Sequence, residues 1–239
     1  FRRVLFRSRL KVAICVPCRD EVMAGFCFDL ARLVQYEATR GVNEIELLQM
    51  PGTLIFTQRE KLADQALELG CDQLLWIDSD QRFPANALEI LQARNVPVIG
   101  TNATTRREPI LPTALNLSIK HDKGEPYQLW EKVESRGKKG IEQVTAVGFA
   151  VTLIDRSVFE KVPKPWFDII WTDAGNVIGE DVAFCVKCLE NDVPVHVDHE
   201  LSMFIGHIGV KTYGWDDVKH GPDHLQRSAN KYRKLSRKK

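Results

Sequence analysis

The chain has 239 residues, 44% of them hydrophobic, and a formal net charge of +1. A chain of this length can bury a sizeable core and is most simply one large domain. It has no apolar run long enough for a membrane-spanning helix. Nine of its 33 Lys and Arg residues lie in residues 1–8 and 231–239, which leaves residues 9–230 with 24 basic and 32 acidic residues and so a net charge of −8, and an acidic body of this kind argues against a dedicated nucleic-acid-binding protein.

The two ends of the sequence are set apart from the rest of the chain. Residues 1–8 resemble the conceptual translation of a sequencing adapter, so we treat them as a non-native segment and leave them out of the fold prediction. We expect one domain over residues 9–225, followed by a basic tail over residues 226–239. Such a tail is typically a solvated terminus, and contact with anionic lipid or nucleic acid is the alternative.

The first half of the chain predicts alternating strands and helices. Short apolar runs indicate strands over residues 11–16, 44–50, 73–77 and 97–100. Apolar residues at helical spacing indicate helices over residues 26–39, 57–69 and 84–94. Alternation of this kind is typical of right-handed crossovers and a largely parallel sheet.

The second half predicts mixed structure. Short β-like pieces occupy residues 113–119, 127–133 and 142–147, apolar segments follow at 151–154 and 165–171, and no regular element is expected beyond residue 209. A helix is predicted over residues 180–190 and a strand over 193–197. The predicted fold class is therefore α/β, with a mostly parallel central sheet flanked by helices and a mixed α+β second half.

The predicted strand at 73–77 ends at two carboxylates, Asp78 and Asp80. Its large apolar residues indicate a strand covered on both faces, and open α/β sheets bind ligands beyond the carboxyl ends of such strands. We expect the two side chains to leave on the same side and to converge where a divalent cation could be held by oxygen ligands. The alternative is a polar turn that one Asp caps.

Six cysteines include the pairs Cys15-x-x-Cys18 and Cys185-x-x-Cys188. Zinc-binding pairs usually close a short loop, whereas these pairs lie far apart in the sequence and the second falls within a predicted helix. We therefore predict free thiols, buried or half-buried, as in proteins of a reducing compartment.

Four motifs together resemble the GT-A glycosyltransferases, especially the broad family 2 type. They are residues 12–19, Asp78-Ser79-Asp80, Gly179-Glu180-Asp181 and His207-Ile208-Gly209, and the resemblance covers most of residues 11–210. It implies a Rossmann-like GT-A domain and a hexosyltransferase-like enzyme that takes sugar from a nucleotide-sugar donor, with UDP or GDP as the expected carrier. The acceptor would be a glycan or another hydroxyl compound, and nucleic acid is expected only as a modified-base acceptor.

The resemblance also implies a bound Mn²⁺ or Mg²⁺ ion. Asp80 would be its direct ligand, Asp78 would bond the nucleotide ribose or a metal-bound water within the same metal site, and His207 would supply a second protein ligand. A cation there neutralises the charge that grows on the departing diphosphate. A single imidazole tilts the choice toward manganese. The alternative for His207 is a histidine packed under a loop.

By the same resemblance, Asp181 of the pair Glu180-Asp181 is the general base that deprotonates the acceptor, as inversion requires. Its task demands a pKa raised towards neutrality by partial burial. The alternative is that both acids only complement the helix dipole at the start of the predicted helix.

The remaining implied donor contacts are Pro17, Arg19, Asp20, Arg59, Ser79 and Gly148. The family's usual aromatic-Asn after Pro17 is replaced by Cys18-Arg19. For Arg59 the alternative is a solvated residue at a helix start, and for Gly148 a simple tight turn. Three tryptophans offer either sugar-stacking faces or core packing, namely Trp166, Trp171 and Trp215.

The sequence thus predicts a metal-dependent, inverting glycosyltransferase, cytoplasmic or peripheral to a membrane. A retaining enzyme of the same fold and a non-catalytic module that binds nucleotide-sugar or glycan remain alternatives. A nucleotidyltransferase is disfavoured because the loop after the first predicted strand has only Gly25 and no glycine-rich phosphate motif. The sequence does not indicate an oligomeric state.

Overall fold

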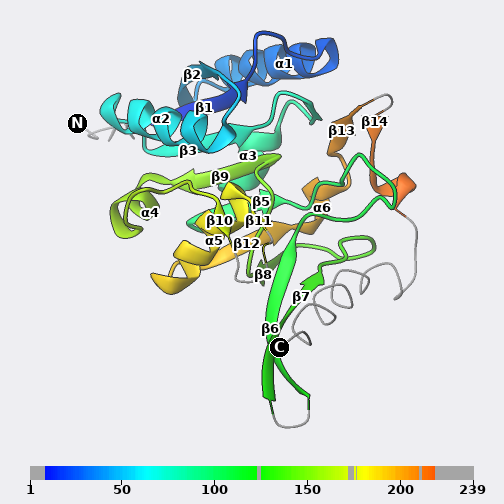
Figure 1. The fold of residues 1–239 in the computed structure, drawn as a ribbon. Helices are drawn as coiled ribbons and strands as arrows, with labels where there is room; N and C mark the ends of the chain where they lie inside the picture. The colour runs from blue at the N-terminus through cyan, green and yellow to red at the C-terminus, as the bar shows by residue number, and fades with distance from the viewer. Residues whose placement is uncertain (1–8, 123–124, 172–174, 176, 210–211, 219–239) are drawn as a thin grey trace, which may run out of the picture.

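The computed structural model describes residues 9–122, 125–171, 175, 177–209 and 212–218. A seven-stranded sheet runs through the body in the order β2-β1-β3-β9-β5-β12-β8 (Figure 1). The bounds of these strands are β1 Leu10–Cys18, β2 Asn43–Pro51, β3 Gln73–Ile77, β5 Val98–Thr101, β8 Ile141–Val144, β9 Val151–Asp155 and β12 Val195–Asp198.

Five of the seven strands point the same way. Strand β1 is parallel to β2 and β3, and β12 is parallel to β5, whereas β9 is antiparallel to both β3 and β5 and therefore joins the two parallel groups. Strand β8 closes the far edge antiparallel to β12. The prediction of a mostly parallel central sheet is confirmed.

Helices cover both faces of the sheet because the strand residues are apolar on both sides. In β1, Ala13 and Cys15 face one buried cluster with helices α2, α4 and α5, while Val12 and Ile14 face another with α1, α3 and α6. The helices are α1 Ala24–Arg40, α2 Ile55–Glu68, α3 Ala87–Ala93, α4 Arg156–Lys161, α5 Glu180–Glu190 and α6 His199–Ser202. The result is the predicted α/β layering.

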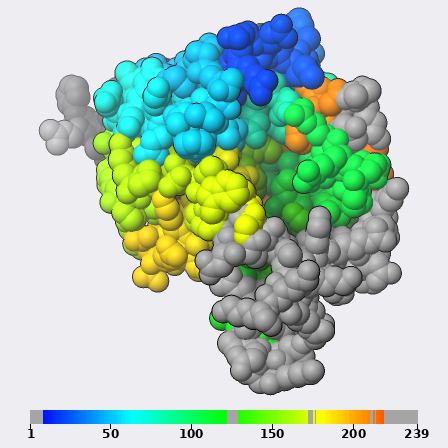
Figure 2. Space-filling model, in the orientation of Figure 1, coloured from blue at the N-terminus to red at the C-terminus, as the bar shows by residue number. Residues whose placement is uncertain are grey.

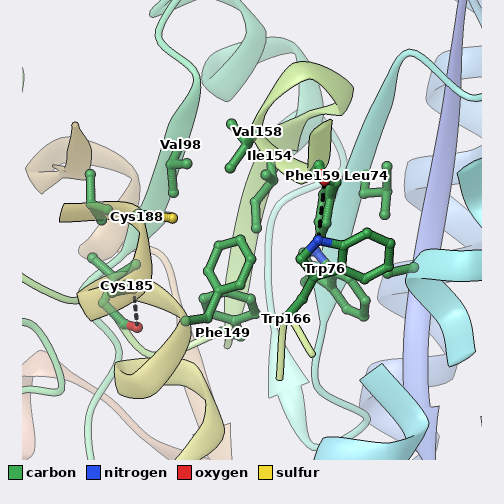
Figure 3. Close-up of a cluster of buried hydrophobic side chains, with 14 of the residues drawn as sticks. Leu74, Trp76, Val98, Phe149, Ile154, Val158, Phe159, Trp166, Cys185 and Cys188 are labelled. Atoms are coloured by element: carbon green, nitrogen blue, oxygen red, sulfur yellow. Dashed lines mark hydrogen bonds between the residues drawn. The ribbon is translucent and has the colours of Figure 1, made fainter. Parts of the chain in front are cut away.

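Aromatic rings fill the core between the sheet and α4 and α5 (Figure 3). Phe149 lies edge-on to Phe184 with 5.5 Å between the ring centroids, and Trp76 lies 6.1 Å from Phe149. Each such ring stabilises the fold by about 1.5–3 kcal/mol through burial. This packing fixes β3, the start of β9 and α5 against one another, and these are the elements that carry the candidate site.

Three smaller sheets complete the fold. Strands β14 (Thr212–Tyr213), β13 (Gly206–Ile208) and β4 (Gln81–Arg82) form one of them, in that order. Strands β10 (Ile170–Trp171) and β11 (Val177–Ile178) form a short hairpin before α5. Strands β6 (Leu115–Asp122) and β7 (Glu125–Lys132) form a long hairpin that projects from the body (Figure 1).

The predicted elements of the central domain are largely confirmed. Strand β3 and helix α5 have the predicted bounds, and most other elements shift by one to three residues. The expectation that nothing regular follows residue 209 was wrong, since β14 and a 3-10 helix, η1 at Trp215–Asp217, lie there. The adapter-like segment 1–8 and the basic tail 226–239 lie outside the described residues.

Two further expectations can be compared with the structure. All six cysteines are free, as predicted, and five of them are buried, whereas Cys27 is exposed and departs from the expectation of buried or half-buried thiols. Among the described residues, no helix has both the length and the apolar character needed to cross a membrane.

Candidate functional site

The candidate site lies at the carboxyl edge of the parallel strands. The loops after β1, β3 and β5 meet there with the turn before β9, because strands that run the same way end at the same edge. Figure 2 shows a recess on one face between the blue-to-cyan N-terminal residues and the green residues of the middle of the chain. A hollow of about 350 Å³ at this edge is lined by Arg19, Asp20, Glu21, Ser79 and Asp80, with Val22 and Met23.

Asp80 and His207 meet although 127 residues separate them in the sequence. Strand β13 pairs antiparallel with β4, which places His207 opposite Gln81, and the amide of Ile208 donates to the carbonyl of Asp80 at 2.7 Å. The Nε2 atom of His207 then lies 3.2 Å from Oδ2 of Asp80. The imidazole is a partner of Asp80, so it does not merely pack under a loop.

Mutual contacts shift the pKa values of Asp80 and His207 in opposite directions. Burial alone would raise the pKa of Asp80, but the hydrogen bond from His207 and the positive charges of His207 and Arg106 lower the pKa overall. Burial alone would lower the pKa of His207, but its contacts with Asp80 and the carbonyl of Thr104 raise the pKa overall. Arg106 Nη1 lies 2.8 Å from Oδ2 of Asp80. The carboxylate of Asp80 therefore has two nitrogen partners, the Arg106 guanidinium and the His207 imidazole.

The same geometry fits a divalent cation. The Nδ1 atom of His207 lies 2.7 Å from the carbonyl oxygen of Thr104, to which it can only donate, so Nε2 is left as the nitrogen that can bind a metal. Oδ2 of Asp80 supplies a hard oxygen beside it. No cluster of three or more metal-binding side chains occurs in the part of the chain that the structure describes. Protein ligands would therefore be these two, with the remaining positions left to phosphate or water.

Asp78 faces a different partner, Arg59 of α2. The Arg59 side chain donates from Nη2 to Oδ1 of Asp78 at 2.7 Å and from Nε to Oε1 of Glu180 at 3.1 Å. Arg59 is only 1% exposed, and its guanidinium lies over the ring of Phe149 at 5.0 Å. The alternative of a solvated helix-start residue was wrong. One buried arginine joins the Asp78 motif to the Glu180-Asp181 motif.

We expect Arg59→Met to lower the free energy of unfolding by about 3–5 kcal/mol, because the change leaves the carboxylates of Asp78 and Glu180 without their buried counter-charge. Urea denaturation of the variant and the parent measures the difference. Lys61→Met is the control, since Lys61 lies exposed on the same helix. A loss no larger than the control's would contradict this role of Arg59.

Asp181 lies in the first turn of α5, close to Gly148. Burial, followed by the charge of Glu180, raises the pKa of Asp181 to about 6, although Arg59 and the amide of Val182 oppose the shift. A Cβ atom on Gly148 would lie 3.5 Å from Oδ2 of Asp181 and 3.3 Å from the side chain of Thr113. The absence of a side chain at Gly148 avoids this close contact with Thr113 and lets the backbone approach the carboxylate of Asp181.

The structure places Pro17, Arg19, Asp20 and Ser79 at the same edge, whereas two of the three candidate tryptophans are core residues. Pro17 is buried at the end of β1, while Arg19, Asp20 and Ser79 line the hollow. Trp166 and Trp215 are core residues whose indole N–H groups donate to backbone carbonyls, so they offer no sugar-stacking face. Only Trp171, at 68% exposed, keeps a free ring.

Two residues of the site were not singled out from the sequence. Arg106 follows β5, and its place after the carboxyl end of a parallel strand was the available signal. Lys132 ends β7 on a hairpin far from the motifs, and nothing in its sequence surroundings distinguishes it. Its half-buried ammonium group is close enough to Asp181 for the carboxylate to affect the pKa of the lysine.

Comparison with known proteins finds a likeness to solved structures. No protein-family profile and no curated protein matches it. A crystal structure of A197 from STIV is similar over 84% of this chain and 86% of its own, with 18% identity and a TM-score of 0.50. That similarity shows a shared fold.

Two other solved structures are similar at TM-scores below 0.5, which do not establish a common fold. One is a glycosyltransferase involved in the glycosylation of the major capsid of PBCV-1, with 15% identity, coverage of 65% and 68% of the two chains, and a TM-score of 0.32. The other is UDP-glucose pyrophosphorylase complexed with UDP-glucose, with 7% identity, coverage of 94% and 99%, and a TM-score of 0.43.

Proposed function

We propose that this protein is a metal-dependent glycosyltransferase of the GT-A type, similar to family 2, that moves a sugar from a nucleotide-sugar to a hydroxyl acceptor with inversion. One observation carries the proposal: Arg59 bonds both Asp78 and Glu180. Because Asp78 precedes Asp80 by two residues and Glu180 precedes Asp181 by one, this bridge supports the assignment of Asp80, His207 and Asp181 to one site. This reaction requires side chains that hold a metal ion next to the donor's phosphates, and a general base whose pKa is near neutral.

The donor would occupy the hollow beside Asp80. Arg19, Asp20 and Ser79 line it and offer a cation, a carboxylate and a hydroxyl to the nucleotide. Asp80 and Nε2 of His207 would hold Mn²⁺ or Mg²⁺, which when bound neutralises charge on the diphosphate. Asp78 remains the proposed contact to ribose or to a metal-bound water. Arg106 adds a second positive charge at the same point.

Asp181 would take the proton from the acceptor hydroxyl. A base works best when its pKa lies near the working pH, and burial holds the pKa of Asp181 at about 6. Oδ1 accepts from the amide of Val182 at 2.7 Å, which orients the carboxylate with Oδ2 on the side of Gly148. A retaining enzyme would not need such a base, so this placement favours inversion.

The competing function is a module that binds nucleotide-sugar or glycan without turnover. It would need the hollow and the cation but not an acid of raised pKa, and Asp181 would then have no role beyond the helix dipole. The placement of Asp181 beside Gly148 therefore supports the enzyme.

A panel of UDP-, GDP- and dTDP-sugars tests the proposal. Each donor is incubated with the protein, with and without Mn²⁺ or Mg²⁺, and release of nucleoside diphosphate is measured. We expect slow release from one donor, dependent on the metal. If one donor binds but none turns over even with glycan acceptors present, the binding module is correct, and if none binds, the site is not for nucleotide-sugars.

A further inference from the structure

Lys132 is a half-buried lysine near the candidate site, and the carboxylate that acts on its charge is that of Asp181. Among the described residues, none forms a hydrogen bond or an ion pair with its ammonium group. A buried ammonium group normally has a partner, because its desolvation costs free energy that a hydrogen-bonded anion offsets. A bound anion would supply a hydrogen-bond partner for the ammonium group of Lys132.

The backbone fixes where Lys132 stands. Lys132 pairs with Leu115 across the β6–β7 ladder, and paired residues share a face of the sheet. The next residue, Val133, donates to the carbonyl of Ala114 at 3.0 Å, and Ala114 follows Thr113, whose side chain lies under Gly148. The base of the β6–β7 hairpin is thereby connected to the segment around Thr113, which contacts Gly148 near Asp181.

The charges that act on Lys132 come from Asp181, the proposed base, and from Arg107. Burial lowers the pKa of Lys132, the carboxylate of Asp181 opposes that shift, and Arg107 adds to it. Arg107 is an exposed cation that also lacks a side-chain partner among the described residues. The ions that perturb Asp80 are instead His207 and Arg106. Lys132 therefore lies near the proposed base, and Arg107 lies near Lys132, whereas His207 and Arg106 lie beside Asp80.

We propose that Lys132, assisted by Arg107, binds an anionic group of the acceptor, so that the acceptor carries a carboxylate or a phosphate near the hydroxyl that Asp181 deprotonates. The inference rests on the proposed function in naming this ligand an acceptor. The anion site itself does not depend on transfer. A charge-assisted hydrogen bond contributes about 1.5–3 kcal/mol, which corresponds to roughly ten- to hundredfold in affinity.

Matched sugar pairs test the anion site directly. Methyl β-D-glucoside is compared with methyl β-D-glucuronide, and glucose with glucose 6-phosphate, by calorimetric titration with and without UDP and Mn²⁺. We expect the parent to bind the charged member of at least one pair about tenfold more tightly or better. Lys132→Met should abolish that preference, and Lys132→Arg should retain it.

The control is Lys120→Met, since Lys120 is an exposed lysine on the same hairpin. A parent without preference for either charged sugar, or a preference that survives in Lys132→Met, overturns the proposal. UDP binding with Mn²⁺ is measured in parallel. If Lys132→Met weakens UDP binding and leaves the sugar preference intact, the lysine serves the donor diphosphate and the acceptor assignment is wrong. If UDP does not bind the parent but the preference depends on Lys132, only the proposed function fails.

Discussion

Asp181→Asn is expected to lower kcat for sugar transfer by about 10²- to 10⁴-fold, the usual contribution of a positioned general base. The amide keeps the size of the side chain and its hydrogen-bonding oxygen but accepts no proton. Binding of the donor should change little, because Asp80 and the hollow are untouched. Steady-state rates with the donor that the parent uses measure the effect.

The pH profile separates loss of the base from loss of structure. Asp181 acts when ionised and its pKa is about 6, so we expect the parent's rate to rise with pH up to about 6 and then to level. Asp181→Asn should lack that rise. Glu190→Gln, at the exposed end of the same helix, is the control and should follow the parent. An Asp181→Asn rate within a few-fold of the parent would remove the base assignment.

Asp80→Ala is expected to lower metal-dependent release of nucleoside diphosphate by about 10²- to 10³-fold, because a bound cation is worth several kcal/mol to a departing phosphate. The variant also leaves His207 without the anion that raises its pKa. Initial rates over a Mn²⁺ titration measure the loss and any shift in the metal concentration required.

Asp64→Ala is the matched control for that experiment. Asp64 is a half-exposed carboxylate of α2 that pairs with Lys164 and does not line the hollow. We expect its Mn²⁺ titration to coincide with the parent's. An Asp80→Ala enzyme that keeps the parent's metal dependence would show that the cation binds elsewhere.

Local sequence patterns were sufficient for the central domain. The run Leu74–Ile77 is fully buried, as four consecutive apolar residues predict, and α5 begins at Glu180 where the apolar spacing begins. These elements are set by the burial of their own residues. Asp80 and Asp181 could therefore be placed at element ends before any tertiary contact was known.

The contacts that make the site could not be predicted in the same way. His207 reaches Asp80 through the short β13–β4 pairing, and two- or three-residue strands leave no periodic pattern. Arg59 has the sequence surroundings of a surface helix residue, and its burial comes from α2 packing on the sheet and from its contacts with Asp78, Glu180 and Phe149. The sequence left the role of Trp166 open, because an indole ring can pack in a core or stack on a sugar. In the structure its N–H group donates to two backbone carbonyls, and the residue is part of the core.

Diffraction from crystals grown with Mn²⁺ and UDP or GDP, recorded for the anomalous signal of manganese, tests the central claim most directly. The account predicts one manganese ion at about 2.0–2.3 Å from a carboxylate oxygen of Asp80 and from Nε2 of His207, with the diphosphate completing its coordination. The nucleotide should lie in the hollow of Arg19, Asp20 and Ser79. Manganese bound away from Asp80, or a nucleotide outside the hollow, would contradict it.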